Sequence, residues 1–417
     1  MGNTYRKMAT TLARFISKKK SVNPQNQEIS ILLAFSLLPL SGFTTDIYVP
    51  SFPDMAVALH TTNINVQSTL TFFLISYGLG QLFIGGVLDC YGRYWIGVGS
   101  LIIFSLASLA IASVDNIYMV DLMRIVQGLT VSAIITGKRA YFVDLFTGKK
   151  LSRYLSLFST IWSIGPIIAP FLGGYLQSCW GWTSNFYALA IVTLIIAFLE
   201  LIFSGETLRR PTAFNFRYIQ KVYRASLGTP SFIFGVLMIG VAYSIMMIYN
   251  MTGSFIIEYH LHLSAIVAGY GSLVMGMAWL CGGLISRATI MAALPKKLIW
   301  ANGLLLFFLL FMFISDRFVH NLYSLLFFAS TIQACAGYIF NNLLTHCMGM
   351  FPQNAGIAIG LTGGINLITT SALSYVLVCV LPAKDEKNLC LSYIMLVFFS
   401  LVLLWLLVKK SAQPANG

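Results

Sequence analysis

Charge is scarce in this sequence, and acidic residues are scarcer than basic ones. Charged residues make up 9% of the 417 residues and hydrophobic residues 58%, with 13 acidic against 26 basic side chains. A soluble domain has about 25% charged residues, so the composition excludes a chain surrounded mainly by water. Apolar runs of about 20 residues recur along the whole length, and each is long enough to cross a bilayer. We therefore predict an all-α polytopic membrane protein.

Several other features are missing. The seven cysteines have neither CxxC nor Cys/His ligand spacing, so no metal site or disulfide framework is indicated. No G-x-x-x-x-G-K-[ST] loop is present, so ATP is not the evident energy source, and no cofactor is expected. The basic residues lie between apolar runs and not on one soluble surface, which argues against nucleic acid as a partner despite the net charge of +13.

The apolar runs predict about twelve membrane spans. The candidate spans are 30–57, 64–88, 94–113, 117–143, 154–177, 184–203, 230–257, 264–286, 297–315, 320–345, 355–380 and 389–408. Most of the 26 Lys and Arg residues lie on the side of the N-terminus, and the other side has only Arg317, Lys384 and Lys387. Because cytoplasmic loops carry the excess of basic residues, both termini are expected in the cytoplasm of a cell whose inner membrane holds the chain.

The longest non-spanning segment lies near the midpoint and is basic. It divides the chain into a basic tail (1–29), a six-helix bundle (30–205), a linker (206–229), a second six-helix bundle (230–409) and a short tail (410–417). Two halves joined by a cytoplasmic linker are typical of transporters in which a substrate path lies between the halves and opens alternately to each side.

The loop after the second span carries the pattern Gly85-x-x-x-Asp89-x-x-Gly92-Arg93. Gly92 permits a backbone turn that other residues resist, and Gly85 is expected to let neighbouring helices approach. The pattern resembles the G-x-x-x-D-x-x-G-R loop signature of the major facilitator superfamily. An ordinary polar turn is the alternative.

The resemblance implies a charge latch at this loop. In the family the aspartate is thought to cap the start of span eleven, where helix N–H groups favour an anion, and the arginine to pair with an acid at the end of span four. The matching places are 352–356 and Asp144. Tyr94 stands where a second basic residue is usual, so a weaker latch is expected.

Span four carries Arg124, Gln127 and Gly128, which resemble the family's R-x-x-Q-G pattern. A guanidinium keeps its charge in proteins, so inside a bundle it must pair, bind backbone carbonyls or face water. The alternative is a local pair with Asp121, three residues earlier, with the arginine extending toward the outer membrane surface.

Span five carries the pattern Gly165-Pro166-x-x-x-Pro170-x-x-Gly173-Gly174. Prolines kink a helix, and glycines allow close helix approach. The pattern resembles the antiporter signature found in proton-coupled exporters of the superfamily, and it implies a bent helix that gates the path. General enrichment of glycine and proline in membrane helices is the alternative.

A carboxylate stands within the first span, at Asp46 in the pattern D-x-Y-x-P-x-x-P. Together with Gln67 and the Gly80-Gln81 pair in span two, this resembles the Bcr/CflA-like branch of drug:proton antiporters. A bare carboxylate in a low-dielectric interior costs several kcal/mol, and protonation near ambient pH relieves that cost. We therefore expect Asp46 to carry protons, with Arg124 favouring its ionised form; the alternative is that Asp46 caps or kinks the span.

Other polar groups within spans are candidates for the substrate cavity, although polar contacts between helices would explain them equally well. They are Asn250, Tyr338, Asn341 and Asn342. A further group at the outer end of span seven has metal-binding residue types, but its spacing favours a solvated loop. It consists of Glu258, His260 and His262.

The leading hypothesis is a monomeric proton-coupled exporter of hydrophobic or amphipathic small molecules. Dedicated export of an endogenous metabolite such as a siderophore stays open, and nutrient:proton symport is less favoured by the pattern in span five. A polytopic membrane enzyme would need facing catalytic groups at membrane depth, whereas the sequence has one interior aspartate without an acidic partner.

Overall fold

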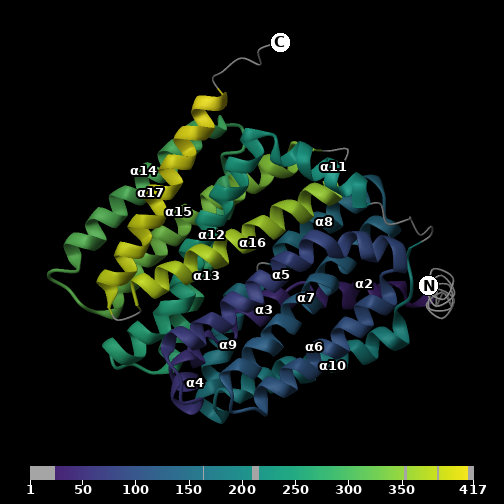
Figure 1. Cartoon of the computed structure of the whole chain (residues 1–417), viewed down its shortest axis with the longest axis horizontal. Helices are drawn as coiled ribbons and strands as arrows, with labels where there is room; N and C mark the ends of the chain where they lie inside the picture. Colours follow the sequence, from purple (N-terminus) through teal and green to yellow (C-terminus); the bar gives the residue numbers. More distant parts are fainter. Residues whose placement is uncertain (1–23, 163, 209–215, 352–354, 383–384, 412–417) are drawn as a thin grey trace, which may run out of the picture.

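The structure is a computed structural model that describes residues 24–162, 164–208, 216–351, 355–382 and 385–411. These residues form helices and short connections, with no β-sheet among them (Figure 1). Eleven of the helical segments in the described part are long and apolar enough to cross a membrane. The predicted all-α membrane fold is confirmed.

The first half of the chain begins with a short turn, η1 (Pro24–Asn26), and continues through nine α-helices. They are α2 (Gln27–Ser36), α3 (Leu40–Asp46), α4 (Phe52–Ala58), α5 (Asn63–Tyr91), α6 (Tyr94–Ala112), α7 (Ile117–Leu145), α8 (Gly148–Trp162), α9 (Ile164–Trp180) and α10 (Thr183–Phe203). A 3₁₀ turn, η2 (Val49–Ser51), lies between α3 and α4.

The linker contains one helix, α11 (Phe216–Leu227), and six long helices follow it. They are α12 (Pro230–Phe255), extended by the π-helical turn η3 (Ile256–His260), α13 (Ala265–Ala288), α14 (Leu294–Ser315), α15 (Leu322–Gly349), α16 (Ala355–Val380) and α17 (Glu386–Ser411).

Two of the predicted spans do not appear as one helix each among the described residues. The first is divided into α2, α3, η2 and α4, because Pro39 and Pro50 lack the N–H group that a continuous helix needs. The fifth, predicted at 154–177, consists of α8 and the 17-residue α9, and residue 163 between them lies outside the described residues. Because residue 163 is not described, α8 and α9 count separately and each is too short to span, so the described residues contain eleven spanning segments and not twelve.

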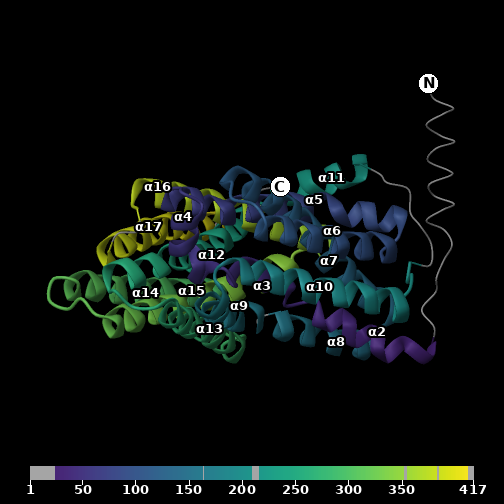
Figure 2. The same ribbon diagram turned by 90° about the horizontal axis from the view of Figure 1, so that it is seen from below.

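The helices pack as two groups. In the first, α5 and α6 pack on α7, and α10 packs on α6; in the second, α13 and α14 pack on α15, and α17 packs on α12 and α14. The groups meet along α5 with α16 and along α9 with α13. Figures 1 and 2 show the early helices on one side and the late helices on the other, with α9 and α13 adjacent between them.

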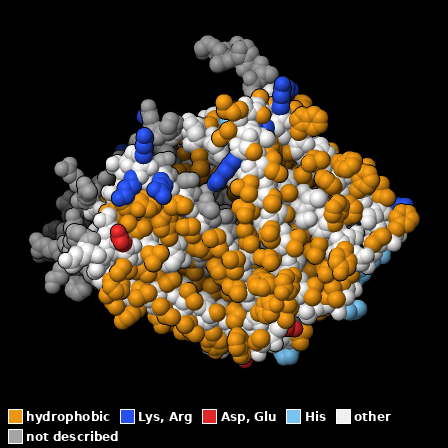
Figure 3. Space-filling view, turned by 180° about the vertical axis from the view of Figure 1, so that it is seen from behind, with side chains coloured by type: hydrophobic (Ala, Val, Ile, Leu, Met, Phe, Trp, Pro, Cys, Tyr) orange, Lys and Arg blue, Asp and Glu red, His pale blue; other side chains and the backbone are white. Residues whose placement is uncertain are grey.

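The outer surface is that of a membrane protein. Large apolar side chains such as Phe198, Trp300 and Phe398 are exposed, and in Figure 3 hydrophobic side chains cover the middle of the molecule. Most Lys and Arg side chains on that face gather at one end, and His side chains lie at the other. An exposed apolar band of this size would be unfavourable in water, so it indicates contact with lipid.

We name the two ends by their connections. The linker end carries α11, and the distal end carries residues 261–264 between η3 and α13. At the distal end α9 and α13 approach closely: a Cβ atom on Gly174 would lie 2.8 Å from the Ala265 carbonyl oxygen, and one on Gly269 would lie 2.9 Å from that of Pro170. The two halves are therefore in backbone-level contact there.

The Gly269 contact makes a direct prediction for stability. Gly269→Ala forces α13 away from α9, and overpacking of this kind costs about 1–3 kcal/mol. Gly99→Ala, whose added methyl group meets nothing within 4 Å, is the matched control and should be neutral or stabilising by up to about 1 kcal/mol. Thermal unfolding of the two purified variants in detergent makes the comparison; equal midpoints would contradict the packing described.

Candidate functional site

Asp46 lies at the junction of the two halves. Its side chain is fully buried at the last residue of α3, and Oδ1 accepts a hydrogen bond of 2.7 Å from Nδ2 of Asn250 on α12. The other carboxyl oxygen, Oδ2, is buried without a hydrogen-bond partner. A buried carboxyl group with one free oxygen can accept a proton without breaking an existing contact.

Arg124 lies beside this carboxyl group but does not form an ion pair with it. Its Nη1 donates to the carbonyl oxygen of Thr44 at 3.0 Å and to Oε1 of Gln127 at 2.8 Å. Thr44 is among the last residues of α3, where carbonyl groups lack partners within the helix. The guanidinium lies 4.5 Å from the ring centroid of Tyr48 and 4.4 Å from that of Phe73.

These contacts decide between the two interpretations of Arg124. The side chain is fully buried, so it does not extend toward the membrane surface. Among the ion pairs of the described residues, none joins Arg124 to Asp121. Nε and Nη2 are buried without hydrogen-bond partners, and the two aromatic faces supply cation–π stabilisation in their place.

Gln127 and Gly128 support the arginine from the same helix. Gln127 donates to Oγ of Ser108 at 2.8 Å, which fixes its other amide atom toward Arg124. A Cβ atom on Gly128 would overlap the side chain of Ser76 and the carbonyl of Phe73. Gly128 therefore allows α7 to lie against α5, and so places Arg124 next to the Phe73 ring.

Three further hydrogen bonds join the halves near Asp46, each from a side chain to a backbone carbonyl oxygen. They run from Gln67 to Met251 at 2.6 Å, from Ser254 to Val49 at 2.9 Å and from Ser371 to Thr71 at 3.0 Å. Together with the bond between Asp46 and Asn250, we call these four contacts the seam. The seam draws α12 and α16 of the second half onto the first span and α5.

The glycines predicted in span five pack against the broken first span and the second half. Added Cβ atoms would collide with the carbonyl of Pro39 at Gly165 and with the carbonyl of Ile47 at Gly173. Pro166 and Pro170 are buried in the same helix. The pattern therefore lets α9 lie directly behind the segment that carries Asp46.

The loop after α5 forms an ionic cluster at the linker end. Arg93 makes an ion pair with Asp144 on α7 and a second one, of 3.0 Å, with Asp89. Gly92 has φ +95°, a left-handed conformation that favours glycine. Among the described residues no atom lies within 4 Å of a Cβ added at Gly85, so they do not show the close helix approach expected there. Residues 352–354 of the predicted capping site, 352–356, lie outside the described residues.

Glu206 completes this cluster and was missed by the sequence analysis. Its carboxylate accepts from the backbone N–H of Arg93 at 2.9 Å and from that of Tyr94 at 3.1 Å. It thereby caps the first turn of α6, where an anion is favoured. An acid directly after a span is the only signal in the sequence, and its partners lie more than 100 residues away.

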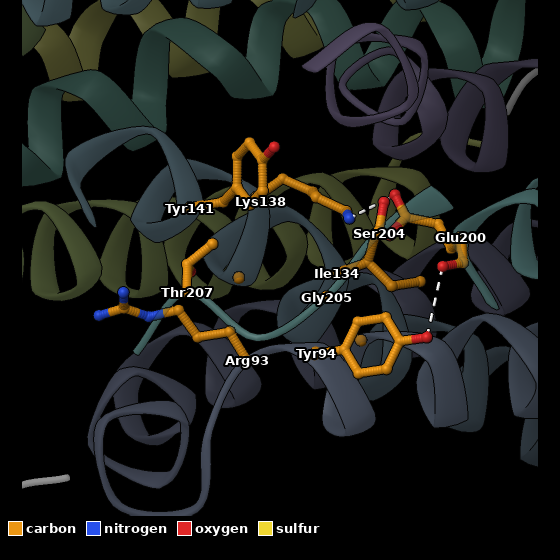
Figure 4. Close-up of a pocket in the computed structure, with 11 residues that line it drawn as sticks. Arg93, Tyr94, Ile134, Lys138, Tyr141, Glu200, Ser204, Gly205 and Thr207 are labelled. Carbon is orange, nitrogen blue, oxygen red and sulfur yellow. Dashed lines mark hydrogen bonds and ion pairs between the residues drawn. The ribbon is translucent and has the colours of Figure 1, made fainter. Parts of the chain in front are cut away.

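A buried ion pair lies next to this cluster, and it was also missed. Nζ of Lys138 lies 2.5 Å from Oε1 of Glu200, and the hydroxyl of Tyr94 donates to the Glu200 carbonyl at 3.3 Å. Figure 4 shows these side chains around a small pocket, with Lys138 pointing across it to Glu200. The pair joins α7 to α10 and holds the linker end of the first half together.

Three of the predicted cavity residues lie elsewhere. Tyr338 contacts Thr289 through its hydroxyl at 2.9 Å, and Asn341 and Asn342 donate to carbonyls one turn earlier on α15. Asn342 also accepts from Nζ of Lys297 at 3.0 Å. These hydrogen bonds stay within the second half, so of the four candidates the structure brings only Asn250 to Asp46.

Glu258, His260 and His262 lie at the distal end. Both histidines are exposed, and no group of three or more His, Cys, Asp or Glu residues that could hold a metal ion is found in the described part of the chain. His262 has φ +54°, in a tight connection before α13. Glu258 and His260 belong to η3, and Oε1 of Glu258 is buried without a hydrogen-bond partner, so of the three residues only His262 lies in the expected loop.

Comparison with known proteins shows the family. The sequence profile of the Major Facilitator Superfamily matches residues 34–373. The chain is 31% identical over 187 residues to "Bicyclomycin resistance protein homolog" of Haemophilus influenzae, a match covering 45% of this chain and 47% of that protein, so it spans about half of that relative. It is 26% identical over 397 residues to "Multidrug resistance protein D" of Escherichia coli, a match that covers 92% of this chain and 96% of that protein.

Solved structures share the fold. A bacterial homologue of the human lysosomal transporter Spinster, in an inward-facing and occupied conformation, matches with a TM-score of 0.71 at 13% identity, over 93% of this chain and 97% of that one. The D-xylose-proton symporter matches with a TM-score of 0.69 at 14% identity, over 89% of this chain and 96% of that one. At these identities the likeness shows the fold alone.

The pair between Lys138 and Glu200 makes a second prediction. Glu200→Gln leaves the partly buried ammonium group of Lys138 without its counterion, and we expect a loss of up to about 3 kcal/mol in the free energy of unfolding. Lys138→Met combined with Glu200→Gln should cost less than the two single changes together, because no charge is left unpaired. A double-mutant cycle by denaturation in detergent measures this, and strictly additive losses would contradict a direct pair.

Proposed function

Because this chain belongs to the Major Facilitator Superfamily, we propose that it is a proton-coupled antiporter that exports hydrophobic or amphipathic small molecules. The family carries small molecules across membranes, and relatives named for bicyclomycin, multidrug and chloramphenicol resistance support the substrate class. The pattern of glycines and prolines in α9, typical of exporters, favours this direction of transport over uptake.

One observation carries the proposal: the carboxyl group of Asp46 is fully buried between the halves and has one unpartnered oxygen. A carboxyl group in such a place exchanges its proton when an opening brings water to it. Asp46 can then take up a proton from the acidic side and release it to the cytoplasm, provided that the protein exposes the carboxyl group to each side in turn.

Arg124 tunes this exchange. Its guanidinium is held near Asp46 by Thr44 and Gln127, without a direct bond to the carboxylate. A positive charge at this range favours the ionised carboxylate and thus helps to release the proton. Because Arg124 stays charged throughout, the site alternates between neutral and positive, and an exported molecule competes with the proton for the same space.

Alternating access follows from two bodies that rock about the site. We assign these bodies to 30–205 and 230–409, joined by the linker 206–229. We infer a state closed at the distal end, because the contact of α9 with α13 lies there and the seam joins the distal parts of α5 and α12. Gly165, Pro166, Pro170, Gly173 and Gly174 would form the bent gate, while Arg93, Asp89, Asp144, Gly92 and Glu206 would fix the linker end of the first body.

We also propose the orientation. The excess of basic residues at the linker end places that end, and both termini, in the cytoplasm of a bacterium; the tails 1–29 and 410–417 fall largely outside the described residues. Tyr223 on α11 donates to the Leu82 carbonyl at 2.6 Å, and burial raises the pKa of Tyr223 to about 12, so this linker contact persists across the cytoplasmic pH range. The chain is expected to work as a monomer.

Asp46→Asn tests the proton carrier. The amide has nearly the same shape but cannot exchange a proton, so proton-driven uptake into inverted vesicles should fall at least tenfold, while substrate binding persists. Proton release on adding substrate to detergent-solubilised protein should disappear as well. Asp54→Asn, at the distal end of the same span, is the control and should transport normally. Undiminished gradient-driven transport by Asp46→Asn would refute the proposal.

The substrate class is tested with the same vesicles. A panel of lipophilic cations, neutral antibiotics and siderophores, with and without an uncoupler, should show uncoupler-sensitive uptake of several unrelated apolar compounds. Uptake of a single siderophore alone would favour a dedicated exporter. Inward accumulation of a nutrient by intact cells would favour symport.

Labelling tests the orientation. Asp115→Cys lies at the distal end and Gln220→Cys lies on α11, and both positions are exposed. In a background with the exposed native cysteines replaced, an impermeant maleimide should label the first in intact cells and the second only in inverted vesicles. The opposite pattern would reverse the proposed direction.

A further inference from the structure

The hydrogen bond between Asp46 and Asn250 differs from the other bonds of the seam. Those from Gln67, Ser254 and Ser371 end on backbone carbonyl oxygens, which stay neutral. The bond from Asn250 ends on a group that can be ionised or neutral, and it crosses from α12 to α3. Its strength therefore depends on the protonation of Asp46, whereas the strength of its neighbours does not.

The surroundings leave Asn250 as the direct partner of the carboxylate. Two ionisable groups in the described residues face Asp46, namely Arg124 from α7 and Tyr243 from α12, and Tyr77 of α5 in turn faces Tyr243. Arg124 donates its hydrogen bonds to Thr44 and Gln127, so it acts on Asp46 through its charge and not through a direct bond. Asn250 is 3% exposed, so its amide is shielded from water in this state. Separating the halves would break its hydrogen bond with the Asp46 carboxylate.

We propose that Asn250 is a positioning residue that locks the empty, ionised carrier in the state closed at the distal end. A proton on Asp46 weakens the lock, and a substrate that takes the place of the Asn250 amide removes it. This inference rests on the proposed function and adds a rule for coupling. The halves separate at the distal end when Asp46 has bound a proton or the site has bound a substrate, and they stay closed when both the proton and the substrate are absent.

The rule follows from the relative strengths of the bond. A hydrogen bond to an ionised carboxylate is roughly twice as strong as one between neutral groups, and the bond from Asn250 ends on a carboxyl oxygen of Asp46. Ionised Asp46 therefore favours the closed seam, because only there does it meet Asn250. An equilibrium shifts only by such differential affinity. As the pH falls and Asp46 takes up a proton, distal opening should become more frequent.

An exchanger needs this restriction. If the empty carrier could reorient freely, substrate would run down its own gradient without moving protons, and coupling would be lost. A contact that is strong only when both ligands are absent prevents that step while allowing the two loaded steps. Asn250, fixed to the opposite half from Asp46, is placed to provide this contact.

The test measures distal opening in purified full-length protein. Ala265→Cys places a thiol at the contact between α9 and α13, where Ala265 is 9% exposed, in a background with Cys179, Cys281 and Cys379 changed to serine. Its maleimide labelling rate is divided by that of exposed Asp115→Cys, which removes the reagent's own pH dependence. Without substrate, the normalised rate should rise about tenfold from about pH 8 to about pH 6.

Asn250→Ala should give fast labelling at both pH values, with the pH dependence lost, and Asn250→Ser, which keeps a short donor, should fall between it and the native residue. Ser254→Ala is the matched control: it removes a neutral bond of the seam, so it should raise the rate at both pH values and keep the pH dependence. A pH response in folded Asn250→Ala equal to the native one would overturn the inference.

Transport supplies a second measurement. In proteoliposomes Asn250→Ala should increase substrate movement down its own gradient several-fold while proton-driven accumulation falls. If Asn250→Ala stays tightly coupled but Asp46→Asn abolishes proton-driven transport, the lock is wrong and the proposed function stands. If Asp46→Asn retains proton-driven transport, the proposed function fails. A Ser254→Ala protein that also loses its pH response would show that the seam acts as a whole and would refute a specific role for Asn250.

Discussion

Arg124 keeps a positive charge inside an apolar helix bundle, and much of the first half is arranged around that charge. The guanidinium is never neutral, and lipid offers no water to solvate it. Its contacts with Thr44, Gln127, Tyr48 and Phe73 come from three different spans. The break in the first span supplies the carbonyl, and Gly128 lets α5 come close enough to supply the aromatic ring. Asp46 is thus placed in a field that exists before any ligand arrives.

The site and the linker end serve different mechanical needs. At the distal end, contacts between the halves are mostly single hydrogen bonds and close backbone approaches, which can be separated and remade. At the linker end, Glu206, the first residue of the linker, caps α6. Ion pairs form there within the first half, between Arg93 and Asp144 and between Lys138 and Glu200. Such pairs are costly to break in a low-dielectric setting, so they keep that half rigid while the distal contacts change.

The all-α membrane fold could be predicted from the sequence, because apolar runs of spanning length are visible in a chain. The R-x-x-Q-G pattern also indicated Gln127 beside Arg124, but nothing in the sequence indicated Tyr48 or Phe73. The sequence singled out Asp46 as well, although its role and the division into two halves stay predictions. It could not predict the partner of Asp46, since Asn250 is one of several polar residues in spans and only packing distinguishes it from Asn341. Glu206 and Glu200 were missed for the same reason: their partners are distant in the chain. The described residues do not show the close approach expected at Gly85, because a glycine in a loop signature does not reveal which neighbour is near.

The seam has an asymmetry between donors and acceptors. Gln67, Ser254 and Ser371 each need a particular side chain, but they end on the main chain of Met251, Val49 and Thr71. Any residue offers the same carbonyl oxygen, so the accepting positions are free to change size and shape without loss of the bond. Substitutions should therefore be tolerated at the accepting positions and not at the donating ones. A transporter of this kind could change the side chains at the accepting positions while the hydrogen bonds between its halves stay the same.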